Sequence, residues 1–128
     1  MYKALIVEDH ADFRQSLNQI LRSRFPALAI AEAGTGKAAL VQIEEFKPDL
    51  VFMDINLPDE NGFSLTKTIK ATHSNTAVII ITAYDLPEYR QAAFEAGASR
   101  FIPKGTLGGE DVLKLVESVM AESPARHP

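Results

Sequence analysis

The chain has 128 residues and a mass of 14.0 kDa, the usual size of one domain. With 46% hydrophobic and 23% charged residues it has the composition of a globular protein, which excludes a disordered polar chain, a collagen-like repeat and a coiled-coil rod. It contains no cysteine, which excludes disulfides, thiolate zinc sites and cysteine nucleophiles, and its formal charge of −4 argues against nucleic-acid binding by the domain itself.

The chain begins on a short apolar run that ends at the acidic pair Glu8 and Asp9. This run is too short for a signal peptide or for a membrane span, which needs about 18 or more apolar residues. We therefore expect a soluble, cytoplasmic protein that makes no contact with a membrane.

Short runs of branched apolar residues predict five β-strands, at 4–7, 28–31, 50–53, 77–81 and 100–102. Three of these runs are apolar throughout, which is typical of strands that are buried on both faces of a sheet. Helix-length segments separate the runs. The first and last of these segments carry apolar stripes at three- and four-residue spacing, namely Phe13, Leu17, Ile20 and Leu21, and Val112, Leu115, Val116 and Val119.

Helix-capping residues agree with these limits. Thr35 can cap a helix that runs to Phe46, and Gly97 can close a helix that follows Pro87. Gly62 is predicted to lie in a loop.

Five β-α units in alternation predict an α/β fold with a parallel sheet and helices on both faces. Because crossover connections are right-handed, we expect the flavodoxin-like, doubly wound (βα)5 fold with strand order 2-1-3-4-5. We assign residues 1–122 to this domain. Residues 123–128 contain two prolines and no periodicity, and are predicted to be a frayed tail or the start of a linker.

Polar residues follow four of the predicted strands. The first strand leads into Glu8 and Asp9, the third into Asp54 and the fourth into Thr82, while Lys104 lies within two residues of the fifth. Since the carboxyl ends of parallel strands share one edge of the sheet, and ligands bind at that edge, we expect these side chains to lie together.

Three carboxylates and one lysine would repel one another unless a cation joined them. Mg²⁺ is the ion that a few carboxylate and carbonyl oxygens suit best. With a lysine and a hydroxyl nearby, such a site can neutralise the oxygens of an incoming phosphoryl group, so that Asp54 acts as a nucleophile and becomes an aspartyl phosphate. The residues therefore predict a phosphoryl-acceptor site.

At this point the chain resembles, over essentially its whole length, the receiver domain of two-component response regulators. The matching motifs are Val7-Glu8-Asp9, Pro48 to Asp54, Leu57-Pro58 with Gly62, Ile81-Thr82-Ala83, and Gly97-Ala98 leading to Phe101-Ile102-Pro103-Lys104. They occur in the family's order. It is most similar to receivers attached to LuxR-type helix-turn-helix domains, although these residues contain no such domain.

The resemblance implies a role for each acidic residue. Asp54 would be the phosphoacceptor, and Asp9 would bind Mg²⁺ directly. Glu8 would assist, through water, and the backbone carbonyl of Asn56 would supply another oxygen to the metal.

The resemblance also implies a switch. Thr82 and Lys104 would bind the phosphoryl oxygens, and Phe101 would change rotamer on activation. The expected result is a change in the face built from the fourth helix, fifth strand and fifth helix, where Tyr84, Tyr89 and Phe94 cluster. The implied partners are a sensor histidine kinase and a second copy of the chain in a phosphorylation-dependent homodimer. The domain would be no enzyme beyond its own phosphorylation and slow autodephosphorylation.

One departure from the family concerns the peptide after the lysine, which is often cis because proline follows. Here Gly105 follows Lys104 and Pro103 precedes it. A cis bond before a residue other than proline costs about 2.5–4 kcal/mol, which argues against it.

Alternative functions remain open from the sequence. The domain could regulate transcription through an effector domain absent from these residues, or act alone through protein contacts. A haloacid-dehalogenase-like phosphatase would need an acid two residues after the nucleophile, where Asn56 stands. An inert pseudo-receiver would not need the complete set of acids, threonine and lysine.

Two further patterns invite other interpretations. Gly34-Thr35-Gly36-Lys37 resembles the end of a P-loop, but Ala31 and Ala38 stand where that motif needs glycine and a hydroxyl residue. This segment is better explained as a turn and helix cap. His10 follows the acidic pair and could be a metal ligand, but the start of the first helix explains it more simply.

Overall fold

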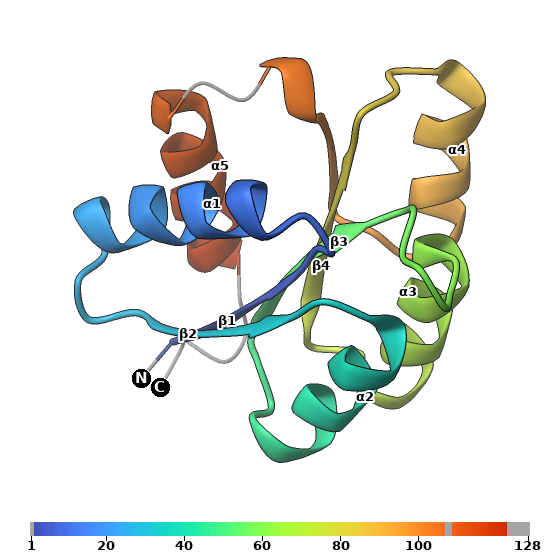
Figure 1. The fold of residues 1–128 in the computed structure, drawn as a ribbon, viewed down its shortest axis with the longest axis horizontal. Coiled ribbons are helices and arrows are strands. Elements are labelled where there is room, and N and C mark those ends of the chain that lie inside the picture. Colours follow the sequence, from blue (N-terminus) through green and yellow to red (C-terminus); the bar gives the residue numbers. More distant parts are fainter. Residues whose placement is uncertain (1, 107–108, 123–128) are drawn as a thin grey trace.

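The computed structural model describes residues 2–106 and 109–122 of the chain. Parallel strands form one sheet in the order β2-β1-β3-β4-β5, and helices cover both of its faces (Figure 1). The predicted fold class and strand order are confirmed. The strands are β1 (Lys3–Val7), β2 (Ala29–Ala33), β3 (Leu50–Asp54), β4 (Ala77–Thr82) and β5 (Arg100–Pro103).

Helix capping sets where several helices begin and end. Thr35 accepts a hydrogen bond from the Ala38 amide at 3.0 Å, as its position predicted. Gly97 follows the fourth helix with φ of 106°, in the left-handed region that favours glycine. The helices are α1 (Ala11–Arg24), α2 (Gly36–Glu45), α3 (Gly62–Thr72), α4 (Pro87–Glu95) and α5 (Gly109–Glu122), and a 3-10 turn, η1 (Lys104–Thr106), follows β5.

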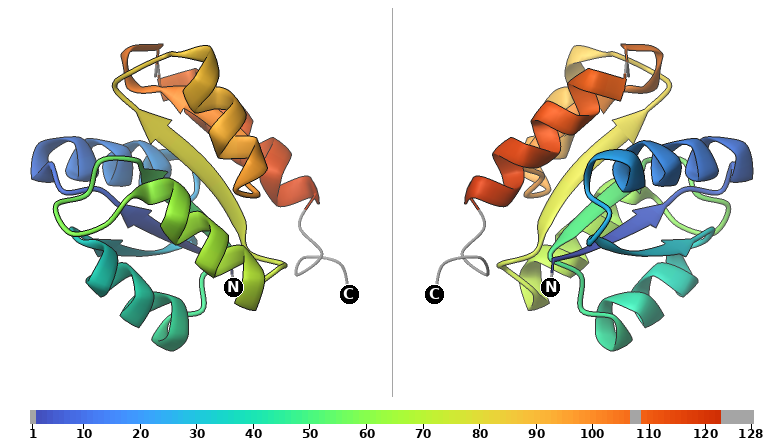
Figure 2. Two further views of the ribbon diagram at one scale, coloured as in Figure 1. Left: turned by 90° about the vertical axis from the view of Figure 1, so that its right-hand side faces the viewer. Right: turned by 90° about the vertical axis from the view of Figure 1, so that its left-hand side faces the viewer.

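Side chains alternate along the strands, so the sheet has a hydrophobic core on each face. In β3, Val51 and Met53 pack in the core beneath α2, α3 and α4, while Leu50 and Phe52 pack in the core beneath α1 and α5. In Figure 2, α2, α3 and α4 lie on the near side of the sheet in the left view, and α1 and α5 lie on the near side in the right view. Both faces are covered, which is why residues 50–53 of this strand are all apolar.

The strand register places the predicted polar residues at one edge of the sheet. Asp54 pairs with Ile81, and Thr82 pairs with Pro103, which is followed directly by Lys104. Val7, the last residue of β1, pairs with Met53. The acidic pair that follows Val7 therefore leaves the sheet beside Asp54.

Gly62, which we predicted in a loop, is instead the first residue of α3. Its backbone packs against the end of β3, where a Cβ atom would lie 2.2 Å from the Asp54 carbonyl oxygen and 2.7 Å from the Ile55 Cα. Asn61 caps the helix just before it, by accepting a hydrogen bond from the Phe63 amide at 2.8 Å. The prediction was wrong because glycine serves here to let a helix approach a strand closely.

Gly62→Ala should therefore lower the free energy of unfolding by about 2 kcal/mol or more, because the methyl group would displace the backbone at the end of β3. Urea denaturation measures this change. Gly105→Ala is the matched control, since a Cβ at Gly105 would meet nothing within 4 Å. An unchanged stability of Gly62→Ala would show that this approach of α3 to β3 is not tight in solution.

In the part of the chain that the structure describes, no helix is both long and apolar enough to span a bilayer. The predicted tail or linker at 123–128 lies outside the described residues, as do Met1 and residues 107–108 of the predicted domain.

Candidate functional site

The candidate site lies at the carboxyl-terminal edge of the sheet, and the predicted side chains meet there. Glu8, Asp54 and Thr82 are buried where β1, β3 and β4 end, and Lys104 begins η1 after β5. Lys104 forms an ion pair with Glu8, and its Nζ lies 3.7 Å from Oδ2 of Asp54. The prediction that these strand ends converge is confirmed.

Glu8 is the most enclosed acid of the site, with none of its surface exposed. One carboxylate oxygen pairs with Lys104, and the other accepts a hydrogen bond from the His10 amide at 3.1 Å. Burial raises the pKa of this carboxyl, but the hydrogen bonds from Lys104 and His10 outweigh it and leave the pKa of Glu8 below its usual value. Glu8 is therefore held as an anion.

Asp54 has the opposite electrostatic character. It is 3% exposed, and burial together with the negative charge of Glu8 raises its pKa to about 6. The charge of Lys104 and a hydrogen bond from the Asn56 amide, 3.4 Å from Oδ1, lower the pKa of Asp54. Their effect is smaller than that of burial and of Glu8. Asp54 is thus a carboxylate whose ionised form the protein alone stabilises poorly, and an added cation would stabilise it.

The acidic residues lie close enough together to share one metal ion. Glu8, Asp9, His10 and Asp54 each offer a ligand atom, and these atoms all lie within 4.8 Å of one another. Oxygen ligands in this number suit Mg²⁺. Asp9 has a side chain that is 34% exposed, so it is open to an ion from solvent, whereas Glu8 is already engaged.

His10 belongs to this cluster although its position in the sequence was explained by the start of α1. It is the residue before α1, as expected, but its side chain does not cap the helix. Instead, Nδ1 lies 3.1 Å from the Glu8 carboxylate and 3.3 Å from that of Asp9. A hydrogen bond to Glu8 raises the pKa of His10. Its place directly after the acidic pair was the only signal in the sequence.

Asn56, the fourth predicted metal residue, lies just beyond β3. It is exposed and forms an isolated antiparallel bridge with Asn61. This bridge brings the two ends of the loop between β3 and α3 together, next to Asp54.

A second contact of the same loop was missed by sequence reasoning. The Asp59 carboxylate accepts hydrogen bonds from the amides of Gly36 at 2.7 Å and Lys37 at 3.1 Å, at the start of α2. These bonds lower the pKa of Asp59. The segment that resembles a P-loop thus receives a carboxylate of the chain itself at a helix amino terminus, in keeping with its interpretation as a turn and cap.

Lys104 is positioned by packing as well as by charge. Its Nζ lies 4.7 Å from the centre of the Phe13 ring, and its side chain is 17% exposed. No cis peptide occurs among residues 2–106 and 109–122, so the peptide between Lys104 and Gly105 is trans, as the sequence suggested.

Thr82 and Phe101 lie between the acidic residues and α4. The Thr82 hydroxyl oxygen accepts a hydrogen bond from the Tyr84 amide at 3.2 Å. The Phe101 ring is 7% exposed and lies 4.7 Å below the guanidinium carbon of Arg90 in α4. The ring is therefore already in a buried position in this structure.

The predicted aromatic cluster on α4 is partly exposed. Tyr84 and Phe94 are each about half exposed, at 54% and 49%. The Tyr89 ring packs edge-on against those of Tyr84 and Phe63, at centroid distances of 6.4 and 6.1 Å. The ring contacts therefore join Tyr84 and Tyr89 to Phe63 of α3.

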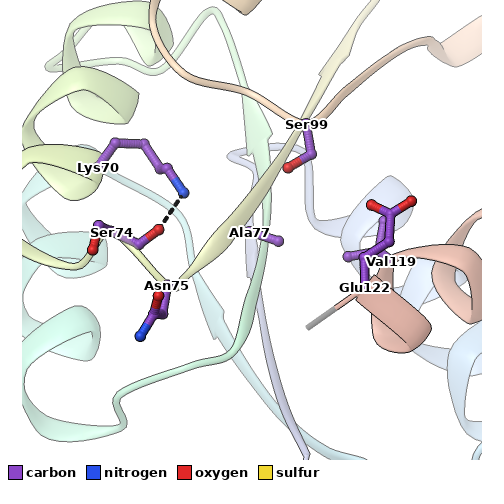
Figure 3. A pocket seen from close by; sticks show the side chains of 7 residues that line it. All are labelled: Lys70, Ser74, Asn75, Ala77, Ser99, Val119 and Glu122. Carbon is purple, nitrogen blue, oxygen red and sulfur yellow. Dashed lines mark hydrogen bonds between the residues drawn. The ribbon is translucent and has the colours of Figure 1, made fainter. Parts of the chain in front are cut away.

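A separate polar cavity of about 160 Å³ lies at the opposite edge of the sheet, where β4 and β5 begin (Figure 3). There the Lys70 ammonium donates hydrogen bonds to the carbonyl oxygens of Ser74 at 2.8 Å and Thr76 at 2.7 Å, and burial lowers its pKa. No predicted site residue lines this cavity. Its lining residues are Lys70, Ser74, Asn75, Ala77, Ser99, Val119 and Glu122.

Comparison with known families gives a match over most of the chain. The model of the response regulator receiver domain matches residues 4–117. A solved structure of a CheY-like response regulator receiver domain protein from Methanospirillum hungatei superposes with a TM-score of 0.89 and 27% identity, and the alignment covers 99% of each chain. Both the sequence pattern and the fold are therefore similar to receiver domains.

Curated relatives are longer proteins. An uncharacterised response regulatory protein of Vibrio cholerae is 38% identical over 104 residues, which are 80% of this chain and 39% of the relative. The transcriptional regulatory protein YdfI of Bacillus subtilis is 34% identical over 106 residues, or 83% of this chain and 49% of the relative. The chain thus spans less than half the length of these two relatives.

Proposed function

Because the chain belongs to the family of response regulator receiver domains, we propose that it is a signalling switch, activated when a sensor histidine kinase supplies a phosphoryl group to Asp54. The observation that carries this proposal is the buried Asp54 carboxylate, which lies beside both Glu8 and the Lys104 ammonium at the open edge of the sheet. Receiver domains are not enzymes in the ordinary sense. Here the transfer to Asp54, and the slow hydrolysis of the aspartyl phosphate to carboxylate and inorganic phosphate, would be the domain's own chemistry.

The acidic residues fit a magnesium ion, which receiver domains generally bind in such a pocket. We assign the direct contacts to Asp9, Asp54 and the carbonyl oxygen of Asn56, and a contact through water to Glu8. An ion held by these residues would supply positive charge to offset that of the carboxylates and of the incoming phosphoryl group. Because burial and the charge of Glu8 raise the pKa of Asp54 to about 6, a cation beside it would favour the ionised carboxylate.

The transfer itself is a displacement at phosphorus. A carboxylate oxygen of Asp54 forms the new bond to phosphorus while the bond from phosphorus to the imidazole nitrogen of the kinase breaks, and the electron pair leaves with the imidazole. Lys104 is near enough to move its ammonium from Glu8 to a phosphoryl oxygen. The Thr82 hydroxyl can bind another oxygen once it releases the Tyr84 amide.

Treatment of the purified chain with acetyl phosphate and Mg²⁺ tests this function by intact mass spectrometry. We expect one phosphoryl group per chain, and none when a chelator removes the metal. Repeated turnover of phosphomonoesters would instead indicate the haloacid-dehalogenase-like phosphatase. No adduct with acetyl phosphate and no response to a beryllofluoride mimic would indicate an inert interaction module.

Asp9→Ala should weaken Mg²⁺ binding by about 100-fold or more, and Glu8→Ala by about 10-fold, since outer-sphere groups commonly contribute 10- to 100-fold. The reason is that Asp9 is open to solvent, whereas Glu8 is buried against Lys104. Isothermal titration calorimetry measures the affinities. Equal losses in the two variants would contradict the assignment of inner and outer contacts.

We propose that the signal leaves the site through Thr82. Movement of its hydroxyl toward the phosphoryl group would break the hydrogen bond to Tyr84 and loosen the loop that leads into α4. Because the Phe101 ring is already buried, its part would be to follow Thr82 into the space vacated beside β5. The face of α4, β5 and α5 would then bind a partner protein, or a second copy of the chain, in a phosphorylation-dependent manner.

In NMR shift mapping with the beryllofluoride mimic, the wild type should respond at Asp54 and also at Tyr84, Phe94 and Phe101. Thr82→Ala should keep the first response and lose most of the second. Thr76→Ala is the matched control, since Thr76 lies just before β4 at its other end. A response that reaches Phe101 undiminished in Thr82→Ala would show that the signal takes another route.

The output of the whole protein is proposed from its relatives. YdfI is a transcriptional regulatory protein, so we infer that regulation of transcription is carried out by residues other than those of this domain. A receiver that acts alone through protein contacts is the alternative. A cytoplasmic location, with no nucleic acid bound by the domain itself, is part of this proposal.

A further inference from the structure

Arg14, in the first turn of α1, joins the acidic pair to the neighbouring strand. Its Nη1 donates a hydrogen bond to the carbonyl oxygen of Glu8 at 2.6 Å, and its Nε donates to a carboxylate oxygen of Glu32, in β2, at 2.7 Å. These are short bonds from two nitrogens of one planar guanidinium group. Arg14 therefore spans the gap between the end of β1 and the edge of the sheet.

Glu32 is itself held from α1 at both oxygens. Its second oxygen accepts a hydrogen bond from the side-chain Nδ2 of Asn18 at 2.7 Å, and the side-chain Oδ1 of Asn18 accepts one from Nε of Arg22 at 2.7 Å. Arg14, Asn18 and Arg22 follow each other at four-residue spacing on one face of α1. The position of the guanidinium group is thus fixed by a network, and not by one flexible ion pair.

The Glu8 backbone is in turn fixed on both sides. Its amide donates a hydrogen bond to the Ala33 carbonyl oxygen at 3.0 Å, which ends the pairing of β1 with β2, and its carbonyl oxygen accepts from Arg14. This carbonyl belongs to the peptide that leads into Asp9. The orientation of this peptide sets the position of the Asp9 side chain relative to Asp54.

We propose that Arg14, anchored by Glu32, is a positioning residue for the metal and phosphoryl site. Its hydrogen bonds to the site reach only the Glu8 backbone, and it acts by fixing the peptide between Glu8 and Asp9 in the orientation that brings both carboxylates toward Asp54. This inference rests on the proposed function, because it assumes that the acidic residues bind Mg²⁺. It adds a pair of residues outside the set of motifs that carries the resemblance to the family.

Arg14→Lys is the sharpest test. Lysine keeps the charge, but its single nitrogen cannot replace the two guanidinium nitrogens that bind Glu8 and Glu32 at the same time. We expect a 10- to 100-fold weaker Mg²⁺ affinity by calorimetry, and a similar loss for Arg14→Ala. Glu32→Gln, which retains an acceptor for Arg14 but not its charge, should give a smaller loss. The melting temperature of Arg14→Lys should change little, since lysine keeps the positive charge and the pair with Glu32 lies partly in solvent, where ion pairs contribute little to stability.

Arg24→Lys is the matched control, since Arg24 lies in the last turn of the same helix in an exposed ion pair with Glu117. It should bind Mg²⁺ as the wild type does. Wild-type affinity in both Arg14→Lys and Arg14→Ala would overturn the inference and leave the proposed function intact. A wild-type protein that binds no Mg²⁺ and accepts no phosphoryl group would instead overturn the proposed function. If Arg14→Ala fails to fold, the lysine and glutamine variants still decide the question.

Discussion

Asp54→Asn should take up no phosphoryl group from acetyl phosphate, where the wild type takes up one per chain. The substitution is nearly isosteric and removes the nucleophilic carboxylate oxygen at the end of β3. No other acid combines burial at a strand end with contact to Lys104, apart from Glu8, among the residues that the structure describes. Glu8 is held by Lys104 and His10 at its two oxygens, which leaves Asp54 as the acceptor.

Intact mass spectrometry with excess Mg²⁺ measures this loss, and peptide mapping locates the adduct. Asp12→Asn is the matched control, because Asp12 is an exposed acid in the first turn of α1, near the same edge. It should be phosphorylated as the wild type is. An adduct that persists in Asp54→Asn would mean that another residue is the phosphoacceptor.

In metal-free protein, Asp54→Asn should also be more stable than the wild type, by about 2–3 kcal/mol at neutral pH. Burial and the charge of Glu8 raise the pKa of Asp54 to about 6, above the value of 3.8 expected in the unfolded chain. Below pH 3.8 the carboxyl is protonated in both states and has no such cost. As the pH rises from about 4 to about 6 the unfolded state loses its proton first, so the wild type loses stability relative to the variant.

Urea denaturation of both proteins between pH 4 and pH 8, in the presence of a chelator, measures this difference. Saturating Mg²⁺ should reduce it at neutral pH, because the cation compensates the carboxylates that repel one another. Asp12→Asn is again the matched control, because it removes an exposed acid from the first turn of α1. A difference between Asp54→Asn and the wild type that is the same at every pH would show that Asp54 is not the group with the raised pKa.

The two predictions follow from one property of the site. Asp54 is expected to destabilise the protein alone as a buried carboxylate, and it is the proposed phosphoacceptor when a cation is present. Functional sites that hold like charges close together commonly lower the stability of the folded protein. The Lys104 ammonium reduces this cost, but it pairs with Glu8 and lies farther from Asp54.

The hydrophobic pattern by itself determined the fold of this protein. Apolar runs of strand length, separated by segments with helical periodicity, have few arrangements that bury both faces of a sheet, and the order β2-β1-β3-β4-β5 is the one found. Because strands in that order end at a common edge, the sequence also determined that Glu8, Asp54, Thr82 and Lys104 would meet. Where the local pattern was ambiguous, as at Gly62, the prediction was wrong.

Only the tertiary structure decided how those side chains share their charges. Lys104 and Glu8 are separated by 96 positions in the sequence, and nothing local indicates that the lysine pairs with Glu8 more closely than with Asp54. The same holds for the ion pair between Arg14 and Glu32, which are 18 positions apart. Periodicity reports which face of an element is buried, whereas pKa values and hydrogen bonds depend on distances and burial across elements, which exist only once the elements are packed together.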